Sequence, residues 1–170
     1  VALIPEAAGE LVRAGSEVYL QAGAGEKSGY PDSAYGALGV RILPDAAALY
    51  GHAQLIVKVK EPIAPEYDLL RPGHVLFSYL HLAAVPELAR VLIQKGLTAV
   101  AFETVSVKGR LPLLAPMSEI AGRLAVQIGA HLLHAPQGGR GVLLGGLPGT
   151  EHGRVVVLGA VGMNLPREPY

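Results

Sequence analysis

The chain contains no cysteine and no long apolar run. Without thiols it has no disulfide, no cysteine nucleophile and no zinc ribbon. The absence of cysteine does not indicate whether the protein works in an oxidising or a reducing compartment. No apolar stretch approaches the ~20 residues that span a bilayer, and the N-terminus has no basic segment followed by an apolar block. From these absences we expect a cytoplasmic protein with no membrane partner.

Charge is also sparse. Lys plus Arg and Asp plus Glu number 14 each among 170 residues, so the formal net charge is zero. Nucleic acids and anionic membranes select basic surfaces, so we expect no nucleic-acid partner. Apolar residues make up 51% of the chain, enough for one globular domain with a core. A neutral, apolar-rich surface is poorly protected against association, which predicts a homo-oligomer.

Short β-branched runs alternate with Ala/Leu-rich amphipathic segments along the chain. This alternation is typical of an α/β protein with a mostly parallel sheet flanked by helices. The expected helices lie at 1–14 (beginning at Pro5), 33–38, 45–50 and 86–95, the last stopped by Gly96. The expected strands lie at 17–20, 40–43, 55–59, 75–79, 98–102 and 154–158.

The longest predicted helix runs from Ser118 to about His134, with Ser118 as its N-cap. Its apolar residues recur every four positions and small residues flank them, so we expect it to be buried between two layers. The glycine-rich stretch at 138–149 lacks the order of a phosphate-binding loop and is interpreted as a connection. The last residues, 166–170, are expected to be an unstructured tail.

Two of the predicted central strands end on ionisable side chains. Lys60 follows the strand at 55–59, and His81 follows the strand at 75–79. Ligands of open α/β sheets bind outside the carboxyl ends of the strands, where a lysine can hold an anion and a histidine can move a proton. Taken singly, Lys60 can also be a solvent-facing lysine and His81 a structural histidine. Lys58 alternates with Lys60 along the strand, so it should face elsewhere.

Other ionisable residues have simpler explanations. Glu103 also follows a strand, and a structural role, such as pairing with Arg123 or capping, is as plausible there as a role in the site. His131 and His134 are three apart on a helix, but no third ligand is near them in the sequence. We therefore predict no metal site.

Several segments, taken together and in this order, resemble the N-terminal part of the alanine dehydrogenase family, and more distantly the related domain of nicotinamide nucleotide transhydrogenases. The resemblance extends over nearly the whole chain and implies a Rossmann/flavodoxin-like substrate domain at 1–134, followed at 135–170 by a connection and the first strand of a cofactor domain. The segments that carry it are 1–5, 21–25, 58–62, 76–83, 102–105, 112–123 and 145–149.

The resemblance implies a chemistry and a set of residues. Members of the family oxidise L-alanine to pyruvate and ammonia with NAD as hydride acceptor. By resemblance, His81 is the general acid/base, Lys60, Tyr79 and Met117 contact the substrate, and Ser118 meets the cofactor. A substrate carboxylate needs a cation and an amine-to-imine step needs a proton acceptor, which agrees with the pairing of Lys60 and His81.

The chain also departs from the family pattern. Members carry a short strand and a loop with a substrate-binding arginine directly before the position of Val1, and a complete glycine fingerprint where this chain has the shorter segment 159–164. The residues after it are fewer than the ~30 of a βαβ unit. We therefore hypothesise a truncated alanine dehydrogenase that does not bind NAD and is inactive alone. A self-associating, non-catalytic remnant and a transhydrogenase-type domain are the alternatives.

Overall fold

The computed structural model describes residues 1–156 in two compact units. The first unit runs from Val1 to Thr104, and the second begins at Val105. The first unit contains helices α1 (Pro5–Arg13), α2 (Asp32–Gly36), α3 (Ala46–His52) and α4 (Pro86–Lys95), strands β1 (Tyr19–Gln21), β2 (Arg41–Leu43), β3 (Leu55–Val57), β4 (Val75–Ser78) and β5 (Thr98–Ala101), and 3₁₀ turns η1 (Glu26–Ser28), η2 (Ala64–Leu69) and η3 (Phe102–Thr104).

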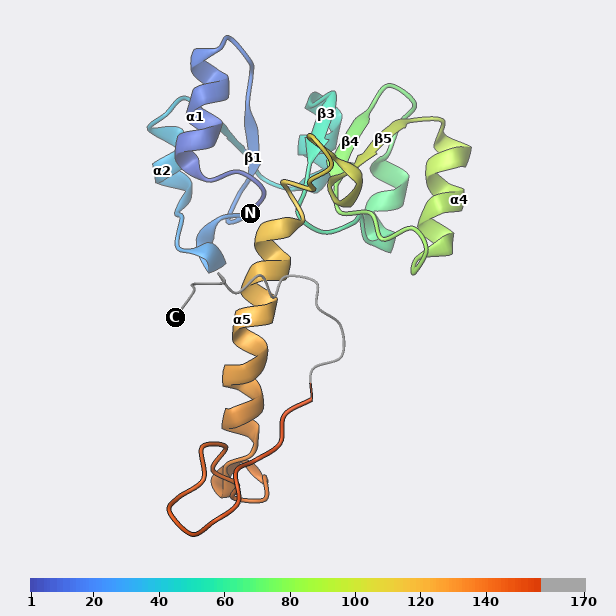
Figure 1. Cartoon of the computed structure of the whole chain (residues 1–170). Coiled ribbons are helices and arrows are strands. Elements are labelled where there is room, and N and C mark those ends of the chain that lie inside the picture. The colour runs from blue at the N-terminus through green and yellow to red at the C-terminus, as the bar shows by residue number, and fades with distance from the viewer. Residues whose placement is uncertain (157–170) are drawn as a thin grey trace. The chain divides into compact units, whose positions relative to one another are not determined.

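The strands of the first unit form two parallel sheets. β1 pairs with β2 in one, and β3, β4 and β5 lie in that order in the other (Figure 1). Each of these pairings is parallel, because a helix or a 3₁₀ turn returns the chain to the starting edge between consecutive strands. The predicted α/β class with parallel strands is confirmed, with the strands divided between two sheets.

Local signals explain where the helices of this unit begin and end. α1 and α4 both carry proline in their first turn, where its missing N–H costs nothing. α4 ends at Gly96, whose φ of 63° lies in the left-handed region that glycine adopts without strain. The side chain of Asp45 caps α3 by accepting a hydrogen bond from the Ala48 amide at 2.8 Å. The predicted bounds of α4 are confirmed at both ends.

Each sheet has its own apolar core. Ile56 and Leu76 of the three-stranded sheet pack against Leu88 and Leu92 of α4, with residues of α3 around them. The two-stranded sheet packs against α1 and α2 through a smaller cluster centred on Ala8 and Tyr35. Burial of these side chains holds the carboxyl ends of the strands in place.

The second unit is dominated by α5 (Ala115–Leu132). It begins a turn earlier than predicted, with Leu114 at the N-cap, so the prediction that Ser118 caps it was wrong. Pro116 in the first turn explains the early start, and the Ser118 amide already donates to the Leu114 carbonyl at 3.2 Å. The prediction that this helix is buried was also wrong, because none of its residues is buried.

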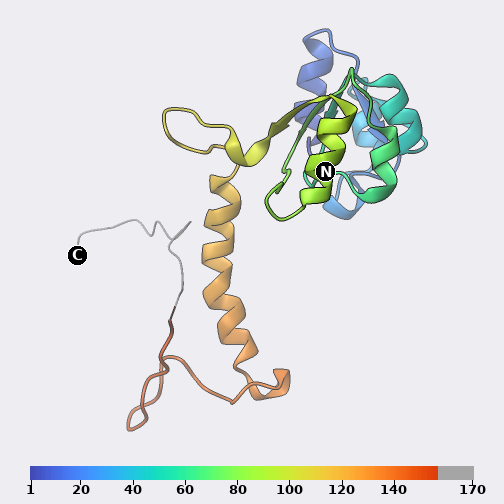
Figure 2. The same cartoon turned by 90° about the vertical axis from the view of Figure 1, so that its right-hand side faces the viewer.

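Irregular segments flank α5. A loop precedes it, closed by an isolated antiparallel bridge between Val107 and Arg110 (Figure 2). Residues 151–156 contain no strand, so the first half of the strand predicted at 154–158 is absent. Residues 157–158, the shortened glycine fingerprint at 159–164 and the tail at 166–170 lie outside the described residues. None of the helices within residues 1–156 is both long and apolar enough to cross a membrane.

Candidate functional site at the strand ends

The chemically active side chains of the first unit follow the three strands of the larger sheet. Lys60 and Glu61 come after β3, Tyr79 and His81 after β4, and Glu103 lies in η3, directly after β5. Backbone pairing continues past the strand ends, since the Tyr79 amide donates to the Val59 carbonyl at 3.1 Å. Because the strands are parallel, their carboxyl ends meet at one edge of the sheet.

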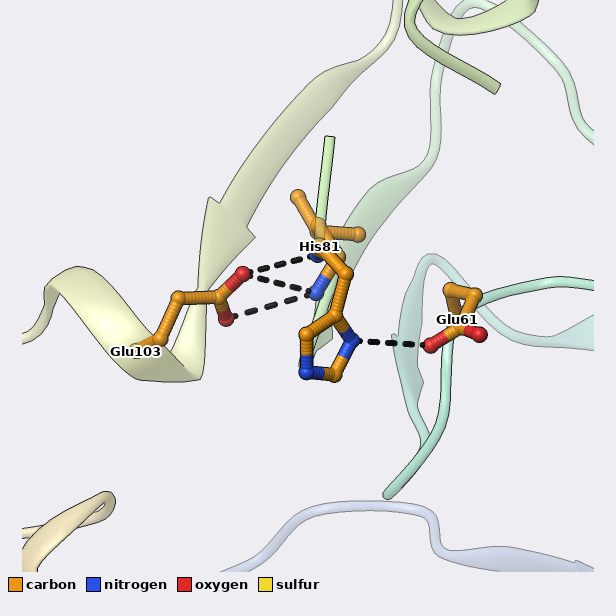
Figure 3. A network of polar contacts seen from close by, with 4 residues as sticks. Glu61, His81 and Glu103 are labelled. Carbon is orange, nitrogen blue, oxygen red and sulfur yellow. Dashed lines mark hydrogen bonds and ion pairs between the residues drawn. The ribbon is translucent and has the colours of Figure 1, made fainter. Parts of the chain in front are cut away.

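Glu103 holds the loop that carries His81. Its carboxylate accepts hydrogen bonds from the Leu80 amide, at 3.1 and 3.3 Å, and from the His81 amide at 2.8 Å (Figure 3). Burial alone would raise the pKa of Glu103, but the amide N–H groups of Glu103, His81 and Leu80 favour the charged form and bring its pKa below the ordinary value. Glu103 is therefore an anion that fixes the backbone after β4.

The backbone of His81 is in an unusual conformation. Its φ is 46°, in the left-handed region that a residue with a Cβ rarely adopts. The His81 carbonyl accepts from the Ala84 amide at 2.8 Å and the Val85 amide at 3.1 Å, so both the amide and the carbonyl of His81 are hydrogen-bonded. Such a conformation costs about 1–3 kcal/mol and persists only when its surroundings enforce it. Glu103 and the following turn provide that enforcement.

The imidazole of His81 is oriented by a second carboxylate. Its Nδ1 lies 3.0 Å from Oε2 of Glu61, and the side chains of His81 and Glu61 are 43% and 25% exposed (Figure 3). The ring of Tyr79 stacks beside it with centroids 5.8 Å apart. The pKa of Glu61 is lowered first by its own backbone amide, then by His81, and further by the charge of Lys60. Glu61 thus connects Lys60 and His81 electrostatically.

The two lysines after β3 have different surroundings. Nζ of Lys58 forms an ion pair with the carboxylate of Glu66, and both side chains are largely buried. Lys60 is exposed, and among residues 1–156 no carboxylate lies within ion-pair distance of its ammonium. Lys58 and Lys60 therefore differ as the alternation predicted, and Lys60 is available for an external anion.

The predicted site residues fall into two groups. Lys60, Tyr79 and His81 lie at the same sheet edge of the first unit, whereas Met117 and Ser118 lie on α5 of the second unit. Sequence reasoning missed Glu61, although its position directly after Lys60 at a strand end was a usable signal. Glu103 proved to cap a loop, one of the roles left open for it.

Neither Ser118 nor Gly23 has a backbone amide free to bind a nucleotide phosphate. Ser118 lies inside α5 with its amide already bonded, and one hydroxyl cannot hold a pyrophosphate. In the glycine turn that follows β1, the Gly23 amide donates to the carboxylate of Asp32 at 3.0 Å, so it is occupied as well. Nor does any group of three or more His, Asp or Glu side chains within residues 1–156 have the geometry of a metal site.

Comparison with known proteins identifies the lineage of this arrangement. A family model described as "Alanine dehydrogenase/PNT, N-terminal domain" matches residues 1–121, and one described as "Alanine dehydrogenase/PNT, C-terminal domain" matches residues 125–164. Alanine dehydrogenase of Mycobacterium tuberculosis (strain ATCC 25618 / H37Rv) is 51% identical over 170 residues, covering 98% of this chain and 46% of the relative. Alanine dehydrogenase of Bacillus subtilis (strain 168) is 49% identical over 169 residues, covering 98% of this chain and 44% of the relative.

Solved structures agree with the sequence relatives. An L-alanine dehydrogenase superposes with a TM-score of 0.85 and 48% identity, covering 95% of this chain and 45% of that one. A transhydrogenase from Sinorhizobium meliloti gives a TM-score of 0.68 and 30% identity, covering 77% of this chain and 40% of that one. The chain thus spans about half the length of the curated relatives it matches. The fold, the ordered motifs and both family models show that the chain belongs to the alanine dehydrogenase/PNT family.

Proposed function

We propose that this chain forms the substrate-binding part of an NAD-dependent L-alanine dehydrogenase, which converts L-alanine, NAD and water to pyruvate, ammonia and NADH. The observation that carries the proposal is the juxtaposition of Lys60, Glu61 and His81 at one sheet edge. The family supports the choice of a small amino acid as substrate. NAD, when bound, would accept the hydride in the proposed reaction.

Lys60 supplies the charge that the substrate requires. Its ammonium is exposed and has no carboxylate partner among the described side chains, so it can bind the carboxylate or the carbonyl oxygen of a small oxoacid. Tyr79 stacks beside His81 and forms a wall of the site. Met117 is a further substrate contact, and Ser118 a cofactor contact, only by resemblance to the family.

His81 moves the proton. With Nδ1–H donating to the Glu61 carboxylate, Nε2 is the acceptor nitrogen of the neutral ring. Once the hydride has left the substrate carbon and an imine has formed, Nε2 takes a proton from the water that adds to that carbon and returns it to the departing ammonia. Glu61 stabilises the imidazolium that exists between these transfers, and Glu103 keeps the ring in reach by fixing the loop. In this scheme Glu61 and Glu103 are positioning residues.

A pyruvate titration followed by amide and imidazole NMR shifts tests the site. We expect binding no tighter than millimolar, about 4 kcal/mol or less, with shifts concentrated at Lys60 and His81. Lys60→Met should abolish these shifts, whereas Lys27→Met, which removes another exposed lysine, should leave them unchanged. If the wild type and Lys60→Met give the same pyruvate-induced shifts, Lys60 does not bind the substrate.

Catalysis by the chain alone is tested separately. We expect no NADH production from L-alanine and no thermal shift on adding NAD, because the amides of Ser118 and Gly23 are already hydrogen-bonded and one hydroxyl cannot hold a pyrophosphate. Turnover that disappears in His81→Ala would show that the chain is active by itself. A thermal shift of several degrees with NAD would show that the cofactor binds.

A non-catalytic role is the second candidate, and one observation favours it. Large apolar residues of α5 are exposed, so the chain has a surface through which copies can associate. A transhydrogenase-type domain that works with separate chains is a further candidate, supported by the structural likeness to the Sinorhizobium meliloti protein. The pyruvate titration separates these candidates, since neither a remnant nor a nucleotide-only domain requires Lys60 to bind pyruvate.

A further inference from the structure

The loop that joins β3 to η2 carries Lys60 and Glu61 between two fixed ends. At its start, the Val59 carbonyl accepts from the Tyr79 amide at 3.1 Å, which ties the loop to the end of β4. Near its end, Pro62 is fully buried. The positions of Lys60 and Glu61 therefore depend on how these two ends are held relative to each other.

One oxygen atom joins the two ends of this loop. Oε2 of Glu66 accepts from Nζ of Lys58 and, at 2.8 Å, from the Ile63 amide. Lys58 thus contacts Glu66 from the start of the loop, and Ile63 contacts it from the end. The side chains of Lys58 and Glu66 are largely buried, so water and salt screen their ion pair less than they screen a surface pair.

Glu66 is itself fixed to the core of the three-stranded sheet. It lies in η2, whose Tyr67 and Leu69 pack against the buried cluster of that sheet. Its other oxygen, Oε1, lies 3.4 Å from the hydroxyl of Tyr50, which belongs to α3 and to the same cluster. Burial, and then the charge of Glu66, raise the pKa of Tyr50, so the hydroxyl stays protonated and donates to the carboxylate.

The neighbouring strand end has the same arrangement. The loop after β4 is held by Glu103 of η3, whose carboxylate accepts from two of its amides. In each loop a glutamate of a 3₁₀ turn holds a segment that carries a residue of the candidate site, Lys60 in one and His81 in the other. The two loops meet where Oε2 of Glu61 lies 3.0 Å from Nδ1 of His81 (Figure 3). A displacement of the first loop would break this contact.

Capping of η2 is the simpler explanation of Glu66, and it accounts for one of its contacts. A glutamate near the start of a helical turn commonly accepts the amide three residues before it, as Glu66 does from Ile63. Capping does not account for the ion pair with Lys58, which connects η2 to the end of β3. This second contact fixes the loop relative to the sheet.

We propose that Glu66 is a positioning residue of the site: through Lys58 and the Ile63 amide, it holds the loop so that Lys60 reaches the substrate anion and Glu61 meets the imidazole of His81. The statement about the substrate rests on the proposed function. The contact between Glu61 and His81 does not, since it involves this chain alone.

Two variants break the ion pair and keep the cap. Glu66→Gln retains an oxygen that can accept from the Ile63 amide, and Lys58→Met leaves the Glu66 carboxylate in place. The readout is the NMR shift of the His81 ring nitrogens at about pH 8, where histidine side chains are generally neutral. In the wild type we expect the proton on Nδ1, because Glu61 accepts it. In both variants we expect it to redistribute toward Nε2, because Glu61 is no longer held beside Nδ1.

Pyruvate binding is the second readout. In both variants the ligand itself has to order the loop, so the Kd for pyruvate should rise roughly tenfold, about 1.4 kcal/mol. Glu66→Gln removes a negative charge and Lys58→Met removes a positive one. Weaker binding of an anion by both therefore cannot come from charge alone. Glu66→Ala, which also removes the cap, should have the largest effect on both readouts.

Asp45→Asn is the matched control for Glu66→Gln. Asp45 caps α3 by accepting from the Ala48 amide, and asparagine keeps an oxygen acceptor there. This variant should change neither the His81 shifts nor the Kd for pyruvate. Circular dichroism confirms the fold of each variant.

The outcomes separate this proposal from the proposed function. Unchanged His81 shifts in both Glu66→Gln and Lys58→Met would overturn it and leave Glu66 as a cap of η2. A change in only one of them would also overturn it, because the shifts would then follow the local charge rather than the ion pair. A wild-type chain that does not bind pyruvate would instead contradict the proposed function, and the His81 shifts alone would then decide the role of Glu66.

Discussion

Helices α4 and α5 have similar sequence patterns and opposite surroundings. Both have proline in the first turn and apolar residues at four-residue spacing. In α4 this spacing places Leu88, 0% exposed, and Leu92 in the core of the three-stranded sheet, whereas in α5 Leu124 is 42% exposed and no residue is buried. Apolar periodicity therefore indicates which face of a helix can be covered. Whether that face is covered depends on the elements packed around it.

The largest expected difference between the two helices concerns stability. Leu88→Ala should lower the free energy of unfolding by about 2–5 kcal/mol, because it leaves a cavity in a packed core. Leu124→Ala should change it by less than about 0.5 kcal/mol, because an exposed side chain leaves no cavity. Urea denaturation of both variants measures the contrast. Equal losses would show that α5 is packed as tightly as α4.

Glu103 of the first unit and Glu119 of the second should also contribute differently to the free energy of unfolding, with the larger contribution again in the first unit. Glu103→Ala should cost about 1.5–3 kcal/mol at neutral pH, because it leaves the Leu80 and His81 amides without their charged acceptor. Glu119→Ala, in the first turns of α5, is the matched control and should cost a few tenths of a kcal/mol at most. Denaturation of both variants beside the wild type measures this difference.

The contribution of Glu103 should also depend on pH. The folded pKa of Glu103 is lowered, so its stabilisation is fully present above the unfolded pKa of a glutamate, ~4.3, and is lost as the pH falls through the folded value. The stability difference between the wild type and Glu103→Ala should therefore shrink below about pH 4. A difference that stays constant down to pH 2 would mean that the carboxylate is not the acceptor.

Local signals explain what the sequence could predict here, and long-range contacts explain what it could not. Pro86 and Gly96 define α4 within its own segment, so its bounds were predicted correctly. Ser118 resembled an N-cap, but Pro116 lies two residues earlier and started the helix first. The hydrogen bond from the His81 amide to Glu103 joins residues that are distant in the sequence, and the positive φ of His81 depends on it. No pattern in either segment indicates these two features.

The exposed face of α5 should matter for association. If copies associate through it, Leu124→Glu combined with Ile128→Glu should weaken the oligomer by at least roughly tenfold in dissociation constant, about 1.4 kcal/mol. Ile93→Glu is the control, since Ile93 is an exposed apolar residue of a different helix, α4. Light scattering over a concentration series measures the effect. A wild-type chain that is monomeric at every concentration tested would contradict the predicted homo-oligomer.

The smallest expected effect concerns helix starts. Asp45→Ala should cost about 1 kcal/mol, because the Asp45 side chain accepts the Ala48 amide at the start of α3. Ser118→Ala should cost nothing and can stabilise α5 by a few tenths of a kcal/mol, because Ser118 lies inside the helix and alanine is the better helix former there. Thermal melts followed by circular dichroism distinguish the two. A loss near 1 kcal/mol in Ser118→Ala would restore Ser118 as the cap, and would place the start of α5 where its sequence first indicated it.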